Sequence, residues 1–125
     1  MENLRMKLYL NDNQRNYLLE ILKASENNAV NGKDQELAIA FNDLYEKIKP
    51  TNANYVALNR GEAETVFEFC EIVRRSLDNA LSFLEKDTER SKEEVEDLKT
   101  KTTIARDEIE KVATQLQEKI RSNPV

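Results

Sequence analysis

The feature that most constrains this fold is a long stretch without glycine or proline, from Glu62 to about Arg121. Good helix formers make up the whole stretch, so the sequence predicts helix along it. Apolar and small side chains recur there in alternating steps of three and four, which is the pattern of a heptad seam. The seam residues are Phe67, Cys70, Leu77, Leu81, Leu84, Val95, Leu98, Thr102, Ala105, Ile109, Val112 and Leu116.

The seam is interrupted by a polar segment between Lys86 and Lys92. Ser91 and Glu94 have the spacing of a capping box there, which favours a turn into a second helix and so a helical hairpin. Without a turn, the stretch would be one rod of about 60 residues and roughly 90 Å. Both possibilities remain open. In either case we expect the seam after Val95 to need a partner chain, which predicts a homo-oligomer, dimeric or higher.

In the first half of the chain, the pattern of residues predicts strands and helices. Residues 6–10 alternate in polarity and precede Asn11 and Gln14, which predicts a strand and then a capped helix to about residue 24. Residues 25–33 contain three asparagines and a glycine, which predicts a loop, and a second helix is expected over 34–48, before Pro50. Residues 56–59 with Glu62 repeat the first pattern at an offset of 48. We expect the two strands to pair as a small ribbon.

The sequence thus predicts a mainly α, helix-dominated α+β fold. Two short strand-helix units are followed by a long helix or helical hairpin with the heptad seam. A chain of 125 residues is expected to form a single domain over 1–125. Within it, an N-terminal strand and helix part covers 1–58, and a long-helix oligomerisation part covers 59–125.

Composition excludes several chemistries. The chain has no histidine and one cysteine, so Ser-His and Cys-His catalysis, histidine-ligated zinc and an internal disulfide are ruled out. Cys70 lies on the apolar seam and is expected to pack in the core. A net charge of −5 without a basic half disfavours duplex nucleic acid. Short apolar runs and a start without a signal sequence predict a cytoplasmic protein that does not bind membranes.

Carboxylates offer one route to metal chemistry, because Mg²⁺ takes oxygen ligands. Glu68 and Glu71 stand three apart on one predicted helix, and Glu94 and Asp97 stand three apart on the next. A hairpin could bring the two pairs together. This partly resembles the Glu-x-x-Glu and Glu-x-x-Asp pattern of the all-α nucleoside triphosphate pyrophosphatases, although Phe67 stands where that family has a paired Glu. Solvated helix faces have the same spacing, so no metal ligands are assigned.

Basic residues offer a second kind of candidate site, which would bind an anion. The segment 99–106 holds three positive charges and three threonines without an acid, and Arg74 occupies a seam position with Arg75 beside it. A guanidinium on an oligomer seam is suited to bidentate anion recognition. The competing interpretation is salt pairing with acids at helical spacing. The candidate ligand-binding residues are Arg74, Arg75, Lys99, Lys101, Thr102, Thr103 and Arg106.

Taken together, these patterns predict a non-enzymatic oligomeric binding protein that masks or sequesters a partner and needs no cofactor. The partner is expected to be a protein or a small anionic ligand such as a nucleotide. Small size and abundant Asn and Lys are typical of an accessory or inhibitor protein of a phage or other mobile element. One alternative is a nucleotide-binding sponge of anti-defence type with an anion site at an oligomer interface. The second is a Mg-dependent all-α nucleotide pyrophosphohydrolase.

Overall fold

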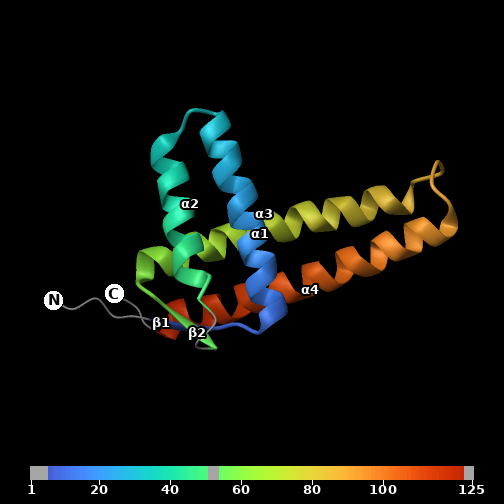
Figure 1. Cartoon of the computed structure of the whole chain (residues 1–125). Coiled ribbons are helices and arrows are strands. Elements are labelled where there is room, and N and C mark those ends of the chain that lie inside the picture. The colour runs from blue at the N-terminus through green and yellow to red at the C-terminus, as the bar shows by residue number, and fades with distance from the viewer. Residues whose placement is uncertain (1–5, 51–53, 123–125) are drawn as a thin grey trace. The chain divides into compact units, whose positions relative to one another are not determined.

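The computed structural model describes residues 6–50 and 54–122 (Figure 1). The start of the chain, on which the expected lack of a signal sequence rests, lies outside these residues. The described residues form a mainly α fold, which confirms the predicted class, in two compact units, Met1–Glu62 and Ala63–Val125. In chain order, the elements are β1 (Met6–Tyr9), α1 (Asp12–Asn31), α2 (Gln35–Ile48), β2 (Tyr55–Leu58), α3 (Arg60–Glu85) and α4 (Lys92–Ser122).

The two strands of unit one pair as an antiparallel ribbon, as expected. Leu8 lies opposite Val56 and Met6 opposite Leu58, and the Leu10 N–H donates to the Asn54 carbonyl at 3.0 Å. Side chains of a strand alternate between its two faces, so Met6 and Leu8 are buried while Lys7 and Tyr9 are exposed.

Each strand leads into a helix through the same capping box. The Gln14 N–H donates to Asn11 Oδ1 at 2.8 Å, and the Asn11 N–H donates back to Gln14 Oε1 at 3.1 Å. Asn59 and Glu62 repeat both bonds: the Glu62 N–H donates to Asn59 Oδ1 at 2.8 Å, and the Asn59 N–H donates to Glu62 Oε1 at 2.9 Å. These reciprocal bonds satisfy N–H groups that the first helical turn leaves without partners. The expected repeat of a strand and a capped helix is therefore confirmed.

The predicted loop over 25–33 is wrong, because α1 continues to Asn31 and packs against α2. Ala29 is 6% exposed, so burial along the helix outweighs the weak helix propensity of the asparagines around it. The turn is short and satisfies the last carbonyls of α1. The N–H of Asp34 donates to the Ala29 carbonyl and that of Lys33 to the Val30 carbonyl, while Lys33 has a φ of 63°. This is a Schellman arrangement with a lysine at the left-handed position.

The second helix begins where expected. The Leu37 N–H donates to Asp34 Oδ1 at 3.1 Å, which makes Asp34 the N-cap of α2. The helix ends at Ile48, and Lys49 is its C-cap with a helical φ of −56° and ψ of −41°. The expected bias of Pro50 against a helical residue before it is therefore wrong for Lys49.

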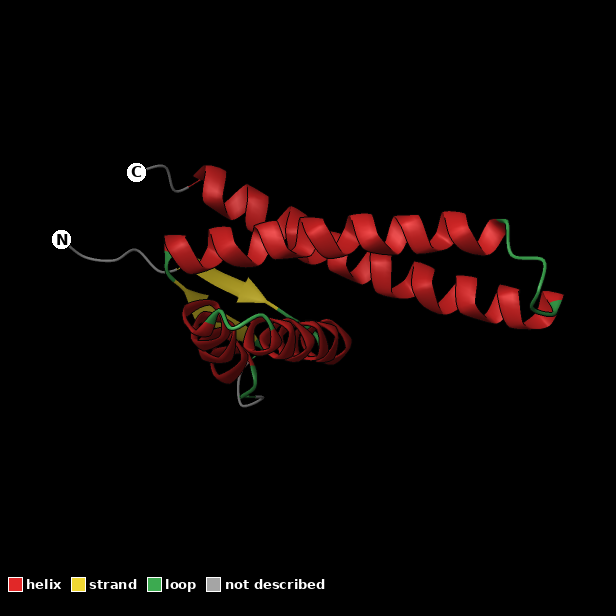
Figure 2. Cartoon of the chain, turned by 90° about the horizontal axis from the view of Figure 1, so that it is seen from above, coloured by secondary structure: helices red, strands yellow, loops and turns green. Residues whose placement is uncertain are grey.

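Unit two is a helical hairpin and not a rod. In both views, α3 and α4 run antiparallel side by side (Figures 1 and 2). At the turn, Asp87 Oδ1 accepts from the N–H groups of Glu89 and Arg90 at 2.9 and 3.1 Å. The Glu94 N–H then donates to Ser91 Oγ at 3.2 Å, which starts α4 as the sequence predicts.

The side chains of the predicted seam are all buried or half-buried. Ile109, Val112 and Leu116 are 0%, 1% and 0% exposed within the single chain. A partner chain is therefore not needed to cover this part of α4, contrary to the reason given for self-association above. None of the described helices has a stretch both long and apolar enough for a membrane span.

Candidate functional site: an ion-pair network across the hairpin

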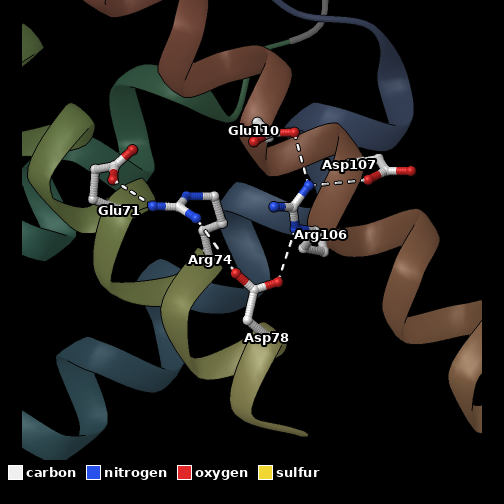
Figure 3. A network of polar contacts seen from close by, with 6 residues as sticks. All are labelled: Glu71, Arg74, Asp78, Arg106, Asp107 and Glu110. Carbon is white, nitrogen blue, oxygen red and sulfur yellow. Dashed lines mark hydrogen bonds and ion pairs between the residues drawn. The ribbon is translucent and has the colours of Figure 1, made fainter. Parts of the chain in front are cut away.

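Asp78, in the second half of α3, joins two arginines from different helices (Figure 3). Its Oδ1 accepts from Arg106 Nε on α4 at 2.9 Å, and its Oδ2 accepts from Arg74 Nη1 on α3 at 3.4 Å. The structure therefore brings together two of the predicted ligand-binding residues, although they lie 32 positions apart in the sequence.

Further carboxylates complete the network. Arg74 Nη2 donates to Glu71 Oε2 at 2.9 Å, and Arg106 Nη1 donates to Glu110 Oε2 at 2.8 Å and to Asp107 Oδ1 at 3.4 Å. Two guanidinium groups thus face four carboxylates, so negative charge is in excess here. An incoming phosphate would meet like charge and would have to displace the existing partners.

Most of these contacts follow from helical spacing. Residues three or four apart share a helix face, which accounts for Arg74 with Glu71 and Asp78 and for Arg106 with Glu110. The Asp78 to Arg106 pair depends instead on the alignment of the two helices. The hydrogen bond that Arg74 donates to Glu71 raises the pKa of Arg74, and the one that Arg106 donates to Asp78 raises the pKa of Arg106, so both stay charged. Both arginine side chains are 25% exposed, so water weakens the pairing.

The other predicted ligand-binding residues do not join this network. Lys101 pairs with Asp97 at 3.0 Å and Lys99 approaches Glu96 at 4.0 Å, both on α4. Thr102 is half-buried and Thr103 is exposed. Arg75 is exposed and forms no ion pair with any described residue. Lys99 and Lys101 thus have acidic partners at helical spacing, as the competing interpretation expects.

The hairpin does not bring the two carboxylate pairs together. Glu68 lines a hollow of about 280 Å³ with Gln117, Ile120 and Arg121, near the C-terminal end of α4. Glu94 and Asp97 lie in the first turns of α4, and the antiparallel arrangement places them at the opposite end of the hairpin. The described residues include no group of three or more Cys, Asp or Glu placed to hold a metal ion.

Cys70 lies in the core, as expected. Its side chain is 0% exposed. Removal from water raises the pKa of the Cys70 thiol to about 12, and the negative charge of Glu71 adds to the shift. The group is therefore protonated at neutral pH and behaves as a small apolar side chain.

Sequence reasoning missed Arg15, which is the main buried charge of unit one at 3% exposure. Its Nη1 donates to the Ile48 carbonyl at 2.5 Å and to the Pro50 carbonyl. A cation at the C-terminal end of a helix satisfies carbonyls that have no partner within the helix and interacts favourably with the helix dipole. No local spacing signals this role, because its partners lie more than thirty residues away.

Sequence reasoning also missed an exposed face of α3, here called the outer stripe: Ile72, Ser76, Asn79 and Phe83. Phe83 is 80% exposed and Ile72 is 58% exposed, and Ser76 and Asn79 between them are exposed too. The spacing of four, three and four residues places all four on one side of the helix. The stripe carries no charge, in a chain of which 34% of residues are charged.

Comparison with known proteins gives no family: no protein-family model, no curated protein and no solved structure matches this chain.

Proposed function

We propose that the chain is a non-enzymatic binding protein that self-associates through the outer stripe of α3 and acts by covering a partner. The observation that carries this proposal is the exposure of Phe83 at 80% and of Ile72 at 58% on one side of α3. Exposed apolar side chains mark interaction sites where they form a contiguous patch, and pairing two copies of the stripe brings Ile72 and Phe83 together.

The energetics support an interface here. Full burial of a Phe or Ile side chain stabilises a complex by about 1.5–3 kcal/mol. The polar residues between them, Ser76 and Asn79, are small and carry no charge, so covering them costs less than covering a charged pair. By contrast, the cross-hairpin network around Asp78 has its charges already paired, so it offers little to a new ligand.

The test is the mass in solution of a double variant, Ile72→Ser with Phe83→Ser, measured by light scattering after gel filtration. We expect the wild-type chain to exceed 14.5 kDa and the double variant to return to it. The matched control is Ile39→Ser with Ile104→Ser, which removes two exposed isoleucines, 61% and 49% exposed, outside the stripe. The control should keep the wild-type mass. A double variant with an unchanged mass would remove the proposal.

A nucleotide-binding sponge is the second candidate, because Arg74 and Arg106 meet at one carboxylate. Calorimetry with linear and cyclic nucleotides separates the two functions. We expect neither heat nor a melting shift, since four carboxylates already occupy the two guanidinium groups. Heat of binding that Arg106→Ala abolishes would instead support the sponge.

We further propose that the protein acts in the cytoplasm as an accessory protein of a phage or other mobile element and masks a host protein. A native mass spectrum of the protein purified from its own host tests this directly. It reports the number of copies and any retained partner together. A spectrum of the chain with a bound small molecule and no protein partner would contradict the masking role.

A further inference from the structure

Building on the proposed self-association, we propose that the outer stripe of α3 binds the same stripe of a second copy in antiparallel orientation. The occupant of this face is thus the chain itself, related by a two-fold axis. Such an isologous contact uses one patch twice and closes at two copies.

The apolar residues of the stripe fit this arrangement. Ile72 lies near one end of the stripe and Phe83 near the other, with Ser76 and Asn79 between them. A two-fold axis midway along the stripe places Ile72 opposite Phe83 of the second copy, and Ser76 opposite Asn79. The large side chains then meet at both ends, and the small polar ones meet in the middle, where the helices can approach closely.

The charges beside the stripe select the direction. Glu68 lies four residues before Ile72, and Lys86 lies three residues after Phe83. They are eighteen residues apart, which is about five helical turns, so they flank the same side of the stripe. The Lys86 N–H donates to the Phe83 carbonyl at 3.1 Å, so the chain is still turning as a helix at this point.

Both flanking side chains are exposed, and neither forms an ion pair with a described residue. In the antiparallel arrangement, Glu68 of each copy lies within one residue of the level of Lys86 of the other, so opposite charges meet twice. In a parallel arrangement, Glu68 would lie near Glu68 of the other copy and Lys86 near its Lys86, so like charges would meet. Like charges placed opposite one another on paired helices are destabilising, so charge favours the antiparallel form.

The contact is short. At the helical rise, the distance from Glu68 to Lys86, one residue past the end of α3, is about 27 Å. An interface of this length is at the small end of specific protein contacts, so we expect the dimer to dissociate on dilution into the low micromolar range. Sedimentation velocity over a series of concentrations measures this directly.

The decisive experiment reverses the flanking charges. Glu68→Lys and Lys86→Glu each place like charges opposite one another at two positions, and each is expected to weaken the dimer by about tenfold. The variant that carries both substitutions restores opposite charges and should regain the wild-type dissociation constant. Glu118→Lys, an exposed charge reversal on α4, is the control and should not change it.

A crosslinking experiment reports the direction independently. When Ser76→Cys protein is mixed with Asn79→Cys protein under oxidising conditions, disulfide-linked heterodimers should predominate, because the two positions face one another only in the antiparallel pair. Cys70 is buried and does not compete. Predominant Ser76→Cys homodimers would overturn the antiparallel arrangement.

The outcomes separate the two proposals. If Phe83→Ser lowers the mass but the charge reversals have no effect, the register proposed here is wrong and self-association through the stripe stands. If the two reversals weaken the dimer but their combination does not restore it, the antiparallel pairing is likewise wrong. If Phe83→Ser leaves the mass unchanged, both proposals fail.

Discussion

Both units bury apolar side chains, but unit one also buries a charged group that bonds the backbone, whereas the charged groups of unit two that form ion pairs lie at its partly exposed surface. In unit one, Asn11, Asp34 and Asn59 cap helices, and the buried Arg15 bonds two carbonyls. In unit two, Ile109 and Leu116 are fully buried, and the ion pairs lie at the partly exposed surface. Different substitutions should therefore unfold the two units, and the same kind of substitution should change their stability by unequal amounts.

The largest effect is expected from a charge in the apolar row of unit two. Ile109→Asp places a carboxylate at a site that is 0% exposed, and burial of an unpaired charge costs several kcal/mol. We expect the hairpin to unfold at room temperature, which circular dichroism would report. Ile104→Asp, at a site on the same helix that is 49% exposed, should leave the helix content unchanged. Equal behaviour of the two variants would mean that the row does not stabilise unit two.

The next effect is expected from the buried arginine of unit one. Arg15→Met keeps the volume and removes the donor, so the carbonyls of Ile48 and Pro50 lose their charged partner. Hydrogen bonds to charged groups contribute about 1.5–3 kcal/mol, and we expect a loss of that order in urea unfolding. Arg75→Met in unit two should change the midpoint by much less, because Arg75 is exposed. An equal loss in both would refute the contrast between the units.

The turn between α1 and α2 offers a gain in stability. Lys33 adopts a left-handed φ of 63°, which costs a residue with a side chain about 1–2 kcal/mol. Lys33→Gly removes this cost but increases the freedom of the unfolded chain, so we expect a net gain of about 0.5 kcal/mol. A higher urea midpoint for unit one would show it. Lys33→Ala keeps the strain and serves as the control.

The smallest effect is expected from the network in unit two. Asp78→Ala removes the carboxylate that joins Arg74 and Arg106, but each arginine keeps another acidic partner. Because these groups are exposed to water, the loss of stability should be smaller than the change caused by Lys33→Gly. The lost charge should also raise phosphate affinity, seen as a melting shift with phosphate in the variant alone. A large destabilisation would assign the network a structural role.

The same contrast explains how far the fold could be predicted from the sequence. The capping boxes at Asn11 and Asn59 were predictable, because a cap and its partner lie three residues apart. The end of α1 was not, since Ala29 is held in the helix by burial and no local signal reports that. The polar segment 86–92 fits a rod as well as a hairpin, and only the pairing of α3 with α4 distinguishes them.

The candidate site was predictable only in part. The sequence marks Arg74 and Arg106 as unusual cations. Their shared contact with Asp78 depends on the alignment of two helices, and the periodicity of the sequence does not determine that alignment. The outer stripe escaped notice because Ser76 and Asn79 do not count as apolar, although their spacing with Ile72 and Phe83 repeats in steps of four, three and four. The signal that could have found the stripe is the absence of charge at these four positions.

The central claim is that the chain self-associates through α3, and sedimentation equilibrium of the wild-type protein tests it most directly. Across a concentration series from micromolar to hundreds of micromolar, we expect the mass to rise from 14.5 kDa towards twice that value, with a two-state monomer to dimer fit. A mass of 14.5 kDa at every concentration would contradict the claim.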